Sequence, residues 1–101
     1  MYLDNHIQQI QKLCKQHKVK TLSVFGSVLN ENFSKSSDID MVIDIDSDDP
    51  FEYAEHYFDF KFQLEALLGR KIDLLEKKAL NNRYLIRSIE KSKKTIYGAE
   101  N

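Results

Sequence analysis

Two short motifs combine residue types that suit metal-dependent phosphoryl chemistry. Gly26-Ser27 and Asp38-Ile39-Asp40 are separated by the ten residues 28–37. A glycine lets the backbone approach phosphate oxygens closely, and the serine after it offers a hydroxyl and an amide. Two carboxylates supply the hard oxygen ligands that divalent cations prefer. Together the motifs predict a site for metal-assisted transfer from a nucleoside triphosphate.

The spacing of the acids supports this interpretation. Residues i and i+2 of a strand point to the same face, about 6.5–7 Å apart. Asp38 and Asp40 could therefore hold two Mg²⁺ ions about 3.5–4 Å apart, the separation used in two-metal phosphoryl transfer. Asp73 is the only acid within residues 72–75, so it is the candidate third ligand and the group that assists the attacking hydroxyl. Ser37 is expected to add a hydrogen-bond donor.

Each part of this constellation is common by itself. A Gly-Ser pair is an ordinary turn, and acids are frequent on the wet face of an edge strand. Their joint occurrence, in this order and at predicted strand ends, favours a functional site. Asp44 and Asp46 continue the same strand face and are expected to be solvated acids rather than ligands.

Apolar periodicity and turn residues predict the elements that position these motifs. Helices are expected over residues 3–18, 51–68 and 79–93, and strands over residues 19–25, 38–46, 71–76 and 95–97, with a helical turn and polar loop over 28–37. In the second strand, the side chains expected to be buried are Ile39, Met41, Ile43 and Ile45. In the last helix, the residues expected to face inward are Leu80, Leu85, Ile86 and Ile89. The order predicts one α/β (α+β) domain over residues 1–101, with a small mixed β-sheet of three to four strands flanked by helices.

The helix predicted over residues 51–68 carries two apolar stripes. The first consists of Phe51, Phe58 and Phe62, and the second of Tyr53, Tyr57, Phe60, Leu64, Leu67 and Leu68. One stripe must serve the core. The other either meets a partner, including a second copy of the chain, or lies against another layer of the same domain.

Composition excludes several classes of protein. The formal net charge is −1, which makes nucleic acid an improbable main partner. A single cysteine, Cys14, excludes an internal disulfide and suits a reducing compartment. No apolar run reaches the roughly 20 residues that span a bilayer, and the N-terminus lacks the order of a signal peptide. A cytoplasmic location is therefore expected.

Taken together, Ser23-Val24-Phe25-Gly26-Ser27, Ser36-Ser37-Asp38-Ile39-Asp40-Met41-Val42-Ile43 and Ile72-Asp73-Leu74-Leu75 resemble the nucleotidyltransferase superfamily of the DNA polymerase beta type. The length is similar to that of its minimal nucleotidyltransferases (MNT). The resemblance covers nearly the whole chain. Members often carry an Arg-Gly pair shortly after the Gly-Ser, where residues 30–33 of this chain read Asn-Glu-Asn-Phe.

This resemblance implies a polymerase beta-like fold and a set of roles. Asp38, Asp40 and Asp73 would form the metal-binding and catalytic triad, while Gly26 and Ser27 would hold the triphosphate of ATP. Minimal members commonly pair with a HEPN-domain toxin, and in characterised pairs the antitoxin transfers AMP from ATP to a toxin tyrosine. The resemblance thus implies a protein adenylyltransferase that acts as the antitoxin of a HEPN/MNT pair.

Two other functions stay open on the sequence alone. A non-catalytic antitoxin would neutralise its toxin by binding alone, which is favoured by an aromatic stripe beyond the one that serves the core and disfavoured by the intact triad. An antibiotic-modifying transferase would need a second domain to hold the drug, for which 101 residues leave little room.

Overall fold

The computed structural model describes residues 1–30 and 32–98, so Glu31 in the predicted loop lies outside the described residues. Its α-helices are α1 (Ile7–Gln16), α2 (Pro50–Leu68) and α3 (Arg83–Ser92). Its strands are β1 (Val19–Phe25), β2 (Ile39–Ile45), β3 (Ile72–Glu76) and β4 (Lys94–Tyr97). Short 3-10 turns lie at η1 (Asp4–His6), η2 (Gly26–Leu29) and η3 (Lys77–Ala79). The predicted strands are confirmed to within a residue at each end.

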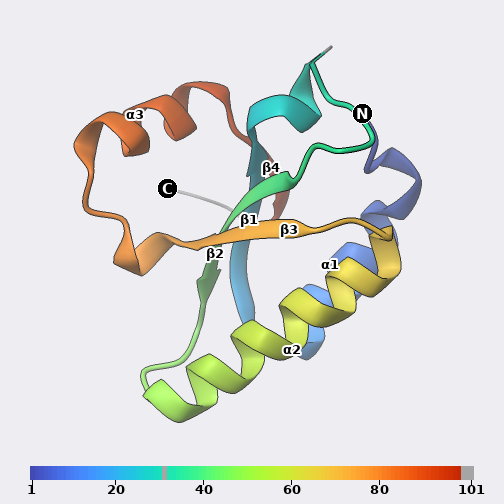
Figure 1. Cartoon of the computed structure of the whole chain (residues 1–101). Coiled ribbons are helices and arrows are strands. Elements are labelled where there is room, and N and C mark those ends of the chain that lie inside the picture. The colour runs from blue at the N-terminus through green and yellow to red at the C-terminus, as the bar shows by residue number, and fades with distance from the viewer. Residues whose placement is uncertain (31, 99–101) are drawn as a thin grey trace.

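The strands form one mixed sheet in the order β3-β2-β1-β4 (Figure 1). β1 runs antiparallel to β2 and to β4, whereas β2 and β3 are parallel. A parallel pair needs a crossover connection, and α2 provides it. The end of β1 therefore lies beside the starts of β2 and β3. This is the edge of the sheet at which the sequence motifs meet.

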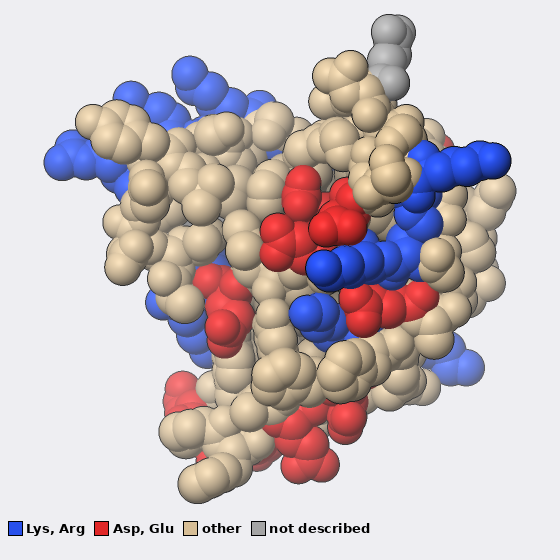
Figure 2. Space-filling model, in the orientation of Figure 1, with Lys and Arg blue, Asp and Glu red and all other residues tan. Residues whose placement is uncertain are grey.

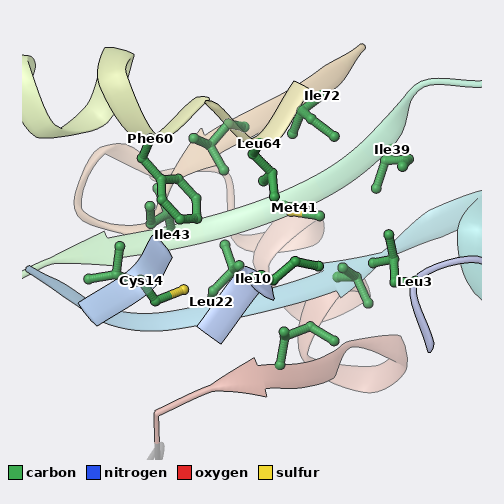
Figure 3. Close-up of a cluster of buried hydrophobic side chains, with 14 of the residues drawn as sticks. Leu3, Ile10, Cys14, Leu22, Ile39, Met41, Ile43, Phe60, Leu64 and Ile72 are labelled. Atoms are coloured by element: carbon green, nitrogen blue, oxygen red, sulfur yellow. The ribbon is translucent and has the colours of Figure 1, made fainter. Parts of the chain in front are cut away.

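Helices α1 and α2 cover one face of the sheet and enclose the core. In Figure 3, Met41 and Ile43 of β2 lie beside Leu64 and Phe60 of α2, and Ile39 lies further along β2; all five side chains are fully buried. Burial of such a side chain stabilises the fold by about 1.5–3 kcal/mol. The predicted buried face of the second strand is confirmed. This core fixes the backbone that carries the acids on the opposite face.

The acid-bearing face is less open than its sequence predicts. Val42 and Asp44 of β2 are both buried, and Asp44 lies 3.6 Å from the ammonium of Lys78. The prediction that Asp44 is a solvated acid is therefore wrong, because Lys78 and the chain after β3 cover that end of the face. Asp46, by contrast, is exposed as expected.

Helix α3 begins later than the predicted residue 79. The side-chain oxygen of Asn82 accepts hydrogen bonds from the backbone N–H groups of Tyr84 and Leu85, at 2.9 and 3.1 Å, and so caps the helix at Arg83. Leu80 consequently lies before the helix. Leu85 is 39% exposed, so its predicted inward position is wrong, whereas Ile89 is buried as expected.

Helix α2 begins one residue before the predicted start and ends at the predicted residue. Asp49 caps it by accepting from the N–H of Phe51 at 2.9 Å, and Gly69 ends it in the left-handed region with φ +62°. Phe60 and Leu64 of the second stripe point into the core. None of the helices in the described part of the chain is long and apolar enough to cross a bilayer.

The first stripe of α2 is exposed to solvent. Phe51, Phe58 and Phe62 are 87%, 51% and 60% exposed, and the rings of Phe58 and Phe62 stack at a centroid distance of 6.2 Å. The interpretation in which this stripe packs against a second layer of the same domain is therefore wrong. We call these three residues the phenylalanine stripe.

Candidate active site

Asp40 occupies the centre of the candidate site. It pairs with Phe25 at the end of β1 and with Asp73 on β3, so all three positions share one face of the sheet. Neighbouring strands lie about 4.7–4.9 Å apart, which places the Asp40 and Asp73 side chains next to each other. Asp38 lies two residues before Asp40 and is exposed. The fold thus brings together the three acids that the sequence selected.

Repulsion between these carboxylates defines the electrostatics of the site. Burial raises the pKa of Asp40, and the negative charges of Asp73 and Asp38 raise it further. Within residues 1–30 and 32–98, no Lys, Arg or His forms an ion pair with any of the three. Figure 2 shows the acidic patch in the centre of the view, over the region where Figure 1 draws β2 and β3. The site therefore favours binding of an added cation.

The chemistry of this donor set fits Mg²⁺, since all three groups are hard carboxylate oxygens. However, no three His, Cys, Asp or Glu side chains of the described residues already surround a single metal position. The two-ion arrangement predicted for Asp38, Asp40 and Asp73 stays a prediction.

Gly26 joins the Gly-Ser turn directly to Asp40. Its φ is +76°, in the left-handed region that favours glycine, and it forms the start of η2. A Cβ atom at this position would lie only 2.6 Å from Oδ2 of Asp40. Glycine is therefore favoured here by its backbone conformation and by the position of the carboxylate. The sequence predicted a close approach to phosphate but not this contact with Asp40.

The two serines of the predicted phosphate site have different surroundings. Ser27 lies half-buried within η2, where its carbonyl accepts from the N–H of Asn30 at 3.0 Å. Ser37 closes the loop before β2, because its hydroxyl accepts from the N–H of Ser34 at 3.1 Å. The expected role of Ser37 as a donor to phosphate stays a prediction, since this hydroxyl already stabilises the loop.

Arg70 is a residue of this region that the sequence did not single out. Its guanidinium donates to the carbonyls of Ser34 and Ser37, at 2.6 and 2.5 Å. The same group lies over the ring of Phe33, 4.4 Å from its centroid, which is a favourable cation–π geometry. Arg70 thereby holds the loop that leads into Asp38. More than 30 residues separate it from its partners, so no local pattern could have revealed it.

The match to a family model decides the class of this protein. The family described as polymerase beta, nucleotidyltransferase, matches residues 8–101. The chain is a polymerase beta-type nucleotidyltransferase. This nucleotidyltransferase is 34% identical over 85 residues to "Putative protein adenylyltransferase MJ1379" of Methanocaldococcus jannaschii, an alignment that covers 83% of this chain and 84% of that protein.

Solved structures share the fold of this nucleotidyltransferase. One is a complex of tri-AMPylated Shewanella oneidensis HEPN toxin with MNT antitoxin, with a TM-score of 0.65, 20% identity, and coverage of 98% of this chain and 74% of the other. Another is a toxin-antitoxin structure with AMP-PNP, with a TM-score of 0.72, 19% identity, and coverage of 94% and 75%. The predicted nucleotidyltransferase fold is confirmed, as is the resemblance to the polymerase beta-type nucleotidyltransferase superfamily.

Proposed function

We propose that this nucleotidyltransferase transfers AMP from ATP to a partner protein, and that the partner is a HEPN-type toxin for which the chain is the antitoxin. The observation that carries the proposal is the register of the sheet, in which Asp40 lies directly beside Asp73 and against the Gly26 backbone. Relatives named as protein adenylyltransferases and a fold shared with an MNT antitoxin support it.

The transfer is a displacement at the α-phosphorus of ATP. An acceptor hydroxyl oxygen forms a bond to this phosphorus, the bond to the bridging oxygen breaks, and pyrophosphate leaves. Asp73 accepts the proton of the hydroxyl. Its position at the edge of the sheet suits this role, because the acceptor protein can approach it from solvent. A carboxylate placed within hydrogen-bond distance of the nucleophile contributes typically 10²–10⁴-fold to the rate.

The remaining residues orient the triphosphate. Asp38, Asp40 and Asp73 would hold Mg²⁺, which when bound supplies positive charge against the phosphate oxygens. Gly26 allows close approach of the backbone, and Ser27 offers its hydroxyl to the phosphates. In this proposal Ser37 supports the loop and adds a further donor when the loop adjusts. Positioning of this kind accounts for most of phosphoryl-transfer catalysis.

The phenylalanine stripe supports a protein partner. Three exposed Phe rings along one helix are unusual on a surface without a function, and aromatic residues are enriched at the centres of interfaces. We propose that the toxin contacts α2 here, or that a second copy of the chain does so in a larger assembly. The reaction is proposed to occur in the cytoplasm, where ATP and magnesium are available.

A non-catalytic antitoxin is the second candidate function. The observation that favours it is that the phenylalanine stripe is available for binding without any contribution from Asp38, Asp40 or Asp73. In that case the chain would neutralise the toxin through complex formation, and the acids would be dispensable.

Transfer of label from ATP labelled at the α-phosphate to the HEPN-type partner tests the proposal. We expect Asp40→Asn to abolish labelling and toxin neutralisation, whereas Asp46→Asn makes the same charge change at an exposed position and keeps both. If Asp40→Asn still neutralises the toxin without labelling it, the non-catalytic function holds. Circular dichroism of both variants confirms that each is folded.

A further inference from the structure

A cavity of about 150 Å³ lies on the acid-bearing face of the sheet, beneath α3. Its apolar lining consists of Val42 of β2 together with Leu80, Ile86 and Ile89. Ile89 and Val42 are buried, so the cavity has an apolar wall on both the sheet and the helix side. An apolar cavity of this size can hold at least one ring of a planar aromatic group.

The cavity lies beside the proposed reaction site. Val42 follows Asp40 by two residues on the same face of β2, which corresponds to a rise of about 6.5–7 Å. A single ribose separates the α-phosphate of a nucleotide from its base. A nucleotide whose α-phosphate lies at Asp40 can therefore extend its base along β2 toward α3.

We propose that this cavity binds the base of the nucleoside triphosphate and selects adenine. The proposal rests on the proposed adenylyl transfer and names the base subsite of that same site. Three polar side chains, Lys77, Glu90 and Lys93, also line the cavity. Glu90 and Lys93, which are joined to each other at 3.0 Å, supply the recognition.

The chemistry of the pair matches one edge of adenine. The carboxylate of Glu90 only accepts hydrogen bonds, and the exocyclic amino group of adenine donates them. Guanine carries a carbonyl oxygen at the corresponding position, which a carboxylate repels. The ammonium of Lys93 is a donor and can serve a ring nitrogen of the base. The arrangement therefore discriminates against guanine through Glu90.

An aromatic ring of the acceptor protein is the competing occupant. A tyrosine ring that entered this cavity would carry its hydroxyl inward toward Val42, which lies beyond Asp40 and away from Asp73. Its hydroxyl could then not attack the α-phosphorus. The base of a nucleotide, by contrast, is joined through the ribose to the α-phosphate. The base can therefore occupy the cavity while the phosphate stays beside the acids.

Titration calorimetry with two ligands tests the proposal. The ligands are the magnesium complexes of tripolyphosphate and of the α,β-methylene analogue of ATP, in which the bond to be broken is replaced. Ile86→Trp fills the cavity from α3, and Leu85→Trp places the same ring on the same helix outside the cavity lining. We expect Ile86→Trp to lower the affinity for the ATP analogue at least tenfold and to keep the affinity for tripolyphosphate within about twofold. Leu85→Trp should change neither affinity.

Glu90→Gln keeps the shape of the cavity and tests selection directly. The preference for the ATP analogue over the corresponding GTP analogue is expected to fall at least fivefold, because the neutral amide can also donate to the guanine carbonyl. Unchanged affinity for the ATP analogue in Ile86→Trp would overturn the proposal. Loss of AMP transfer in Ile86→Trp, with unchanged affinity for the nucleotide, would also overturn it and would assign the cavity to the acceptor protein. If the wild-type protein binds neither ligand, the proposed function itself has failed.

Discussion

Substitution of Gly26 by alanine separates the backbone requirement of the Gly-Ser turn from its effect on Asp40. A non-glycine residue in the left-handed region costs about 1–2 kcal/mol. In a domain of this size such a loss lowers the melting temperature by about 4–16 °C. The added Cβ would also lie 2.6 Å from Oδ2 of Asp40, whereas ordinary carbon–oxygen contacts begin at about 3.3 Å.

The carboxylate of Asp40 must therefore retreat by about 0.7 Å in Gly26→Ala. The stability cost of this shift is small, since the contact involves the end of a side chain. The cost to catalysis is larger, because a displacement of about 1 Å at a reacting centre costs up to about 10²-fold in rate. We expect transfer from labelled ATP to fall by about 10- to 100-fold in Gly26→Ala at saturating magnesium.

Gly69→Ala is the matched control. Gly69 has φ +62°, and an added Cβ there would meet nothing within 4 Å. This variant should lose about the same 1–2 kcal/mol in urea denaturation but keep transfer within about twofold. The assay is run at a temperature at which circular dichroism shows both variants to be folded. Equal transfer by the two variants would refute the proposed contact between Gly26 and Asp40.

Three further predictions concern the acids, the loop and the phenylalanine stripe. The raised pKa of Asp40 means that its stabilising contribution to the metal-free fold is complete below the unfolded pKa of about 4 and is lost as the pH rises through the folded value. In EDTA, the melting temperature of Asp40→Asn should therefore exceed that of the wild type, and the difference should grow from pH 4 to pH 7. A difference that stays constant over this pH range would contradict the prediction. Arg70→Gln should slow AMP transfer and lower the unfolding free energy in urea by about 1–2 kcal/mol, because charged hydrogen bonds to Ser34 and Ser37 are lost. Lys71→Gln, at an exposed neighbouring position, should leave both quantities unchanged. Phe58→Ser combined with Phe62→Ser should keep the unfolding free energy within about 1 kcal/mol and weaken toxin binding at least tenfold in calorimetry, whereas the exposed Tyr84→Ser should not.

Local patterns were sufficient to predict most of the fold. The alternation in 38–46 identified the buried face of β2, and the Asp-Pro and Gly signals located both ends of α2. The three acids and the Gly-Ser turn were also recognisable, because their spacing along the chain reflects positions at strand ends. These features depend on neighbours within a few residues, which a sequence pattern records.

Tertiary contacts account for what the sequence could not predict. Burial of Asp44 depends on Lys78, which comes from a segment 34 residues later. The role of Arg70 depends on a loop more than 30 residues earlier, and the contact between Gly26 and Asp40 depends on the register of β1 with β2. Exposure of the phenylalanine stripe could not be predicted locally, because it depends on which side of α2 packs against the sheet.

Intact-mass spectrometry of the HEPN-type partner tests the central claim most directly. The partner is incubated with this protein, ATP and magnesium, and in parallel with Asp40→Asn and Asp46→Asn. Adenylyl transfer predicts a mass gain of one or more AMP units on the partner with the wild type and with Asp46→Asn, and none with Asp40→Asn. An unchanged partner mass, in a mixture where the two proteins form a stable complex, would contradict the enzymatic account.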